Sequence, residues 1–196
     1  SLTVQATRLD AERPRPGGKQ GLSGVCRKSE NLAGRRFGYE PNVPKLKEGE
    51  TEPYPIRPAT EADLPFMMEI YAQAVRRHAI ACVRTPEIFK YELTGQSEKN
   101  ANRFETYLIE DQSGEPVGYF QHAHWLGMTG VSALWYELKP GVSWLAVTPS
   151  VVRHLWNKGQ VYAKRDGKTC TSFGFMLGAQ HPAYEALGKN LPSVSD

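Results

Sequence analysis

Apolar residues recur every three and four positions in parts of the chain, a spacing that places them on one face of a helix. Over residues 63–81 this spacing predicts a helix with one buried face. Thr60 and Asp63 match a capping box at its start, whereas Asp63 as the N-cap places Pro65 in the first turn, where a missing N–H costs least. We favour Asp63 as the N-cap. A shorter helix is predicted over residues 86–93.

Apolar and polar residues alternate in the middle of the chain, which is the period of a half-buried strand. Two such strands, 104–110 and 116–125, are joined by the glycine-containing loop 111–115, a combination typical of a hairpin. A third strand is predicted over 131–138. Ile56-Arg57 is expected to form a short edge strand ahead of the first helix, because prolines on both sides are tolerated there.

Prolines and glycines mark the boundaries of the elements that follow. Lys139-Pro-Gly-Val142 has the residues that a type II turn prefers, so a strand over 142–147 is predicted to fold back on the preceding one. Thr148 and Pro149 then supply an N-cap and a first-turn proline for a helix over 149–164. The last predicted elements are a strand over 171–177 and a short helix that begins at Pro182.

The net charge of +3 lies entirely in the first part of the chain. Residues 1–55 carry ten Lys and Arg against seven Asp and Glu, while residues 56–196 carry fourteen of each. This excess is small for a nucleic-acid-binding protein, which usually shows a concentrated basic stripe, so no nucleic-acid partner is expected. The pairs Arg35-Arg36 and Arg76-Arg77 are interpreted as solvated surface. The proline-rich stretch 41–53 is interpreted as a linker.

Cysteine, histidine and hydropathy patterns argue against several other classes of protein. Cys26, Cys82 and Cys170 lie far apart and form no C-x-x-C pair, which favours a reducing, cytoplasmic setting. His122 and His124 lie on one strand, but spacing ties no third ligand to them, so no metal site is expected. No run of about 18 apolar residues occurs, so no membrane contact is expected.

Three motifs stand at the head, middle and end of the predicted order of elements: Ile56-Arg-Pro-Ala-Thr-Glu-Ala-Asp-Leu-Pro65, Gly114-Glu-Pro-Val-Gly-Tyr119 and His181-Pro-Ala-Tyr-Glu-Ala-Leu-Gly188. With the order strand, two helices, antiparallel strands, helix, strand and short helix, they resemble the GNAT superfamily of acyl-CoA N-acyltransferases. The resemblance implies an α/β fold with a mixed, mainly antiparallel sheet flanked by helices.

The resemblance also implies a chemistry, the transfer of an acetyl group from acetyl-CoA as co-substrate to a primary amine of a small molecule. Tyr184 falls close to the family's general acid toward the leaving thiolate, although a tyrosine in a short amphipathic helix also suits packing. Glu137, near the end of a central strand, is placed either to accept the amine proton, directly or through water, or to be solvated.

In this family a glycine-rich loop and a helix N-terminus hold the pyrophosphate of CoA. The resemblance places this loop at the start of the helix predicted to begin at Pro149, with the CoA-binding residues Val147, Ser150, Val151 and Arg153. No glycine occurs there before Gly159, and the apolar residues suit a packed core as well. Two functions therefore remain open: an N-acetyltransferase, or a non-catalytic GNAT-like domain that shapes the substrate site of a catalytic neighbour.

Residues 34–40, Gly-Arg-Arg-Phe-Gly-Tyr-Glu, look like the tail of another GNAT-like domain. We therefore expect residues 1–40 to be the C-terminal remnant of a preceding domain, 41–53 a linker, and 54–196 a GNAT-like domain that lacks its closing strand. On this interpretation the chain is similar to tandem-GNAT acetyltransferases and contacts a neighbouring GNAT-like domain. The parent gene is then expected to encode more sequence on both sides.

Overall fold

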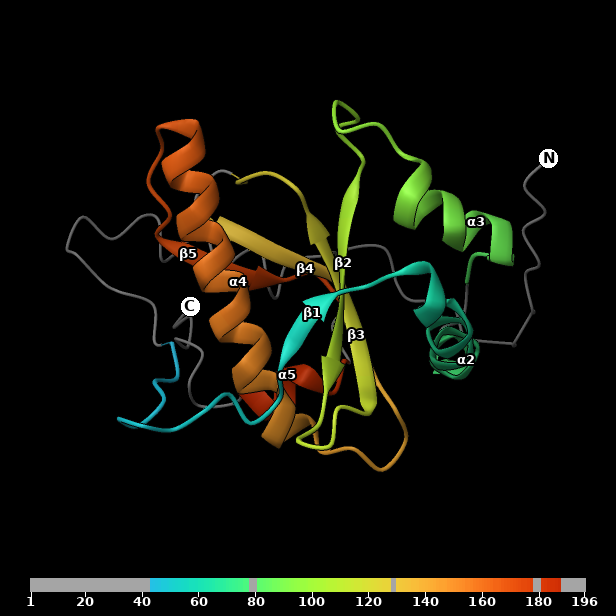
Figure 1. The fold of residues 1–196 in the computed structure, drawn as a ribbon, viewed down its shortest axis with the longest axis horizontal. Coiled ribbons are helices and arrows are strands. Elements are labelled where there is room, and N and C mark those ends of the chain that lie inside the picture. The colour runs from blue at the N-terminus through green and yellow to red at the C-terminus, as the bar shows by residue number, and fades with distance from the viewer. Residues whose placement is uncertain (1–42, 78–80, 128–129, 178–180, 188–196) are drawn as a thin grey trace, which may run out of the picture.

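A mixed sheet organises the part of the chain that the computed structural model describes, residues 43–77, 81–127, 130–177 and 181–187. Its strands follow one another in space in their order along the sequence. Neighbouring strands are antiparallel except for the last pair, which is parallel (Figure 1). The strands are β1 Ile56–Pro58, β2 Phe104–Glu110, β3 Pro116–Ala123, β4 Gly130–Leu138 and β5 Ser172–Phe175.

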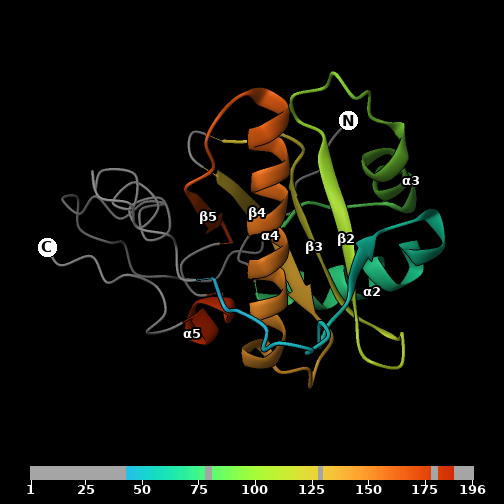
Figure 2. The same ribbon diagram turned by 60° about the vertical axis from the view of Figure 1, so that its left-hand side comes forward.

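Helices cover both faces of this sheet, and both views show α4 on one side and α2 with α3 on the other (Figures 1 and 2). The helices are α2 Leu64–Ala74, α3 Pro86–Lys90, α4 Trp144–Asp166 and α5 Ala183–Leu187. Under α4, Val151 and Leu155 pack against Phe120 in the larger core. On the opposite face, Ile70 of α2 packs against Tyr119.

The order of elements is the one that carries the resemblance to the GNAT superfamily, and the predicted fold class is confirmed. The hairpin strands β2 and β3 lie where the alternation of apolar residues places them, since Thr106 pairs with Gln121 and Leu108 with Tyr119. Residues 43–55 contain no helix or strand. The expected remnant over 1–40 lies outside the described residues, and the division into domains stays a prediction.

The prediction of a strand over 142–147 and of a helix start at Pro149 is wrong. The turn itself forms as predicted, with Gly141 at φ 85° and the Val142 N–H donating to the Lys139 carbonyl at 3.1 Å. The chain then enters α4 at once, with Ser143 as N-cap accepting a hydrogen bond from the Ala146 N–H at 3.3 Å. The reason is the spacing of Val147, Val151 and Leu155, which are all fully buried at every fourth position.

Each of the two predicted starts of the first long helix is correct in one feature. Asp63 directly precedes α2 and Pro65 lies in its first turn, as predicted. The Asp63 carboxylate, however, accepts from the Thr60 N–H at 2.7 Å and from its hydroxyl at 2.8 Å, which is the capping-box contact. The α-helix ends at Ala74 and continues as a 3₁₀ turn, Val75–Arg77, beyond which residues 78–80 lie outside the described part.

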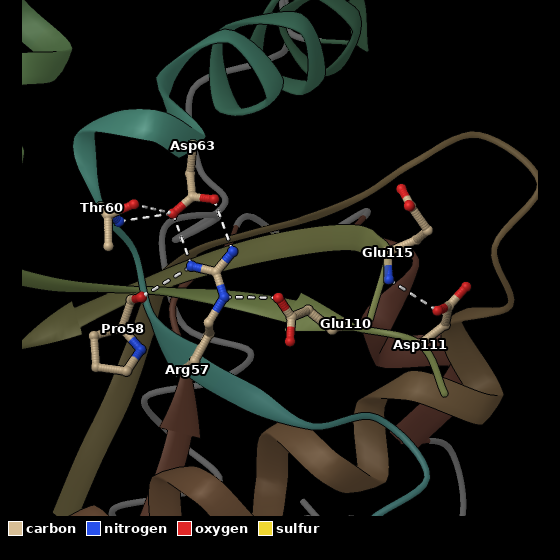
Figure 3. A network of polar contacts seen from close by, with 7 residues as sticks. All are labelled: Arg57, Pro58, Thr60, Asp63, Glu110, Asp111 and Glu115. Carbon is tan, nitrogen blue, oxygen red and sulfur yellow. Dashed lines mark hydrogen bonds and ion pairs between the residues drawn. The ribbon is translucent and has the colours of Figure 1, made fainter. Parts of the chain in front are cut away.

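Arg57 joins three elements at the edge of the sheet (Figure 3). Its Nε donates to Glu110 of β2 at 2.6 Å, and its two terminal nitrogens donate to Asp63 at 2.8 Å each. These hydrogen bonds lower the pKa of Asp63 to about 2. Because the folded-state pKa is depressed, the pair stabilises the fold above the unfolded pKa of about 3.9, and this contribution is lost as pH falls toward about 2.

Replacing Asp63 by asparagine is therefore expected to lower the free energy of unfolding at pH 7 by about 1 kcal/mol, since the pair is partly open to solvent. The deficit relative to wild type should shrink when urea unfolding is repeated between pH 4 and 2. Asp166→Asn, which breaks a more exposed pair between neighbouring residues, Arg165 and Asp166, is the matched control and should leave stability nearly unchanged. An equal deficit for Asp63→Asn at pH 7 and pH 2.5 would contradict this account.

Candidate active site

β4 and β5 run side by side for a short distance and then part. Their pairing ends at Ala133 and Phe175, with a last hydrogen bond from the Met176 N–H to the Ala133 carbonyl at 2.8 Å. At the same point β4 contains a bulge, because Ala133 pairs with His122 and Trp135 with Gln121, which leaves the residue between them without a partner on β3. β4 therefore continues to Leu138 without β5 beside it.

Three aromatic residues occupy the space where the strands part. Tyr136 on β4 lies 4.9 Å from Trp144 of α4, centre to centre, and Trp144 lies 4.9 Å from His181. His181 Nε2 donates to the Tyr136 carbonyl at 2.9 Å, and its Nδ1 accepts from the Ala183 N–H at 3.2 Å. These two partners assign a neutral histidine protonated on Nε2. His181 therefore ties the start of α5 to the free edge of β4.

Glu137 follows Tyr136 and is 3% exposed, so the expectation of a solvated carboxylate is wrong. Arg77, from the turn after α2, donates to its Oε2 through Nη2. The other carboxylate oxygen of Glu137, Oε1, lies 3.6 Å from His181 Nε2. A buried carboxylate needs a charge partner, and Arg77 supplies it. The sheet thus holds an ion-paired carboxylate on the part of β4 that has no β5 beside it.

A pocket of about 220 Å³ opens beside Glu137. It is walled by the end of α2, the end of β4, the turn after β4 and the first residue of α4. Its lining residues are Ile70, Gln73, Ala74, Arg77, Glu137, Leu138, Lys139, Pro140, Gly141, Val142 and Trp144. Apolar walls with a few convergent polar groups are typical of a small-molecule site.

Tyr184 lies on the β5 side of the same region. Its hydroxyl donates to the Phe175 carbonyl at 3.0 Å and accepts from the Leu177 N–H at 3.2 Å. Its ring is partly buried against the larger core and lies 6.3 Å from the His181 ring. These contacts hold the end of β5, which agrees with the packing interpretation. The role of Tyr184 as general acid stays a prediction.

Of the four residues predicted to bind CoA, Val147 lies at the end of the first turn of α4, and Ser150, Val151 and Arg153 lie further along the helix. Val147 and Val151 are fully buried in the core. Ser150 donates to Glu52 at 2.5 Å, and Arg153 donates to Glu52 at 2.9 Å, which fastens the segment before β1 across α4 (Figure 2). Burial acts to raise the pKa of Glu52, but these hydrogen bonds outweigh it and lower the pKa.

The physical basis of the CoA-site prediction, a helix start at Pro149, is therefore wrong. The first N–H groups of α4 belong to Trp144 and Leu145, and Leu145 is 69% exposed. CoA contacts by the four predicted residues stay a prediction. Arg77 is exposed, as the sequence predicts, but its ion pair with Glu137 was not predicted. The helical spacing that buries Ile70 and Ala74 continues to Arg77 and was the available signal.

His122 of β3 and His124, just beyond the end of β3, lie in different surroundings. His122 is fully buried, its Nδ1 donates to the Ala123 carbonyl at 2.8 Å, and burial lowers its pKa. His124 contacts the Arg103 carbonyl at 2.9 Å instead. Among the described residues, no three His, Cys, Asp or Glu side chains form a group that could hold a metal ion. In the same part of the chain, no helix is long and apolar enough to cross a membrane.

Comparisons with known proteins return structural similarity alone. No protein-family model matches the chain. No curated protein matches it either. Among solved structures, a predicted acetyltransferase with acetyl-CoA from Clostridium acetobutylicum is 12% identical, with 69% of this chain and 88% of that chain covered and a TM-score of 0.44.

Two further solved structures are similar to the same degree. An aminoglycoside acetyltransferase from an uncultured soil metagenomic sample, in complex with sisomicin, is 13% identical, with 74% of this chain and 91% of that chain covered and a TM-score of 0.42. Saccharomyces cerevisiae N-myristoyltransferase with bound myristoyl-CoA is 14% identical, with 64% of this chain and 32% of that chain covered and a TM-score of 0.40. Similarity at this level identifies neither a substrate nor a reaction.

Proposed function

We propose that this chain is an acyl-CoA-dependent N-acyltransferase that moves an acetyl group from acetyl-CoA to a primary amine of a small molecule. The observation that carries the proposal is the buried Glu137 on the part of β4 that extends beyond its pairing with β5, facing a pocket. A carboxylate kept from water beside an apolar pocket is suited to bind an ammonium group and take its proton.

The proposed thioester site is the free edge of β4. Beyond Ala133 this edge has no strand beside it, so an extended ligand with amide groups adds to it as a further strand would. The Tyr136 carbonyl already accepts a hydrogen bond from His181, but its second lone pair is available to a ligand. The exposed first turn of α4 lies next to this edge and is suited to the phosphates of CoA.

In the proposed reaction the ammonium group of the substrate gives a proton to Glu137. The neutral amine then attacks the thioester carbonyl, the new N–C bond forms, and the C–S bond breaks with release of the CoA thiolate. As the amide forms, the nitrogen loses its second proton. Tyr184 or water protonates the thiolate and takes up this proton in return, and Glu137 gives its own proton back to solvent. Arg77 compensates the charge of the Glu137 carboxylate while the pocket is empty and is displaced in part by the incoming ammonium group.

A second candidate function is a non-catalytic GNAT-like domain that shapes the substrate site of a neighbouring one. It is favoured by the aromatic filling of the space between β4 and β5, where Trp144 and His181 lie 4.9 Å apart. The start of α4, Ser143-Trp-Leu-Ala146, also lacks the glycines of a close-fitting phosphate loop. A tandem arrangement with a preceding domain, joined through residues 41–53, belongs to this proposal.

An assay of acetyl transfer distinguishes the two proposed functions. The chain is incubated with acetyl-CoA and a panel of primary amines, and release of the CoA thiol is followed with time. Amine-dependent thiol release supports the enzyme, while release equal to that without amine supports the non-catalytic domain. The exposed Cys82 must be blocked or replaced by serine first, because its free thiol reacts with the same reagents. A cytoplasmic setting belongs to the proposal as well, since Cys82 and Cys170 are both free thiols.

A further inference from the structure

We infer that the pocket beside Glu137 selects a small primary amine that also carries a carboxylate or another anionic group. The inference rests on the proposed function, because it takes this pocket for the amine site. It goes further in naming the chemical class of the substrate, a compact zwitterion such as an amino acid.

The ionisable side chains that line the pocket are one acid and two bases. Glu137 is 3% exposed, whereas the Arg77 side chain is 44% exposed and Lys139 is exposed. Arg77 bonds Glu137 through a single nitrogen, which leaves the rest of its guanidinium group open to a ligand. Within the described residues Lys139 has no carboxylate at ion-pair distance. The negative charge therefore lies inside and the positive charges lie toward solvent.

Gln73 adds an acceptor to the lining of the same pocket. Its Nε2 donates to Glu69 at 3.2 Å, which orients the amide so that Oε1 is the remaining atom. Gln73 Oε1 is buried and has no hydrogen-bond partner within the described residues. A buried acceptor without a donor costs free energy, and a ligand N–H removes that cost. Gln73 and Glu137 together offer acceptors for the donors of an ammonium group.

These placements discriminate between amines by the charge at their other end. A diamine that binds Glu137 brings its second cation toward Arg77 and Lys139, where like charges repel it. An amino acid brings a carboxylate to the same two groups, and a guanidinium group binds carboxylates well. The volume of about 220 Å³ is below the roughly 300 Å³ at which typical ligand sites begin, so the substrate is small.

Calorimetric titration without acetyl-CoA tests the inference. The probes share one four-carbon chain: 4-aminobutanoate, butylamine and 1,4-diaminobutane. L-Alanine and ethylamine form a second, shorter pair. At low salt we expect the two amino acids to bind at least about fivefold more tightly than the matched amines, and this preference should weaken as salt screens the charges.

Lys139→Gln is expected to reduce the preference by about threefold or more, because it removes an exposed cation without unpairing Glu137. Lys164→Gln is the matched control, since this exposed lysine lies in the last turn of α4 while the pocket borders the first. It should leave the preference unchanged. The inference is overturned if the diamine or butylamine binds as tightly as 4-aminobutanoate, if the two variants behave alike, or if no probe binds.

The proposed function fails separately from this inference. Tight, carboxylate-dependent binding without acetyl transfer to any amine leaves the pocket's selectivity standing and removes the enzyme. Acetyl transfer that prefers 1,4-diaminobutane over 4-aminobutanoate leaves the enzyme standing and removes the selectivity.

Discussion

Replacing Glu137 by glutamine is expected to lower kcat/KM for acetyl transfer by about 100-fold to 10,000-fold, the range typical of a lost general base. Glutamine keeps the size of the side chain and an oxygen that accepts the hydrogen bond from Arg77. It cannot take a proton from the substrate. The amine must then lose its proton to water before it binds, and only the small neutral fraction reacts.

The pH profile distinguishes a lost base from a distorted pocket. The rate of the Glu137→Gln variant should rise about tenfold per pH unit up to the pKa of the amine, while wild type levels off at lower pH. Glu87→Gln, at an exposed position of α3, is the control and should match wild type. A Glu137→Gln variant with at least half of the wild-type rate and an unchanged pH profile would rule out Glu137 as the base.

Phe120→Ala is expected to lower the free energy of unfolding by about 3–5 kcal/mol, as for other large truncations in a packed core. Phe120 is fully buried on β3 beneath α4. Its ring stacks on Tyr107 at 5.6 Å and meets the edge of His154 of α4 at 5.2 Å. The truncation removes ring contacts to both the sheet and the helix, and the surrounding side chains can close the cavity only in part.

Urea unfolding at pH 7 measures this loss as a fall in the midpoint at constant m-value. Phe120→Leu is the matched control and should cost less than about 1.5 kcal/mol, because it nearly conserves volume. The loss of about 3–5 kcal/mol is a large share of the 5–15 kcal/mol by which most domains are stable. A loss below about 1 kcal/mol for Phe120→Ala would show that α4 does not pack on this face.

The elements that local pattern determines are those predicted correctly. The hairpin of β2 and β3 follows from alternating residues on both sides of a loop that contains Gly114, and Gly114 has the positive φ of 83° that such a loop requires. The turn with Gly141 and the short helix after His181 follow from similar local signals. Each of these elements is determined by residues that are close to one another in the sequence.

The start of α4 shows where local pattern is ambiguous. The β-branched residues in the run Val142 to Val147 favour a strand. The recurrence of apolar residues at every fourth position from Val147 to Leu155 favours a helix instead. Thr148 and Pro149 imitate a helix start, but burial of Val147 against the sheet decides for a helix that begins earlier. The predicted CoA site is affected by the same error, because it assumes that the helix begins at Pro149 and not at Trp144.

The candidate site depends on contacts that sequence spacing does not contain. Arg77 and Glu137 are 60 residues apart, and Arg153 and Glu52 are 101 apart. Glu137 itself was found through the family resemblance, but its burial and its partner required the folded sheet. Lys139 and Gln73 line one pocket because the turn after β4 lies against the end of α2, a contact that the sequence does not reveal.

The most direct measurement is the fate of a labelled acetyl group. The full chain is incubated with acetyl-CoA that carries ¹³C in its acetyl group and with a panel of amino acids, monoamines and diamines, and the amines are analysed by mass spectrometry. We expect the label to appear on the amine nitrogen with release of free CoA, and Glu137→Gln to slow this strongly. If no amine gains label, and millimolar acetyl-CoA leaves the melting temperature unchanged, the chain is not an acetyltransferase.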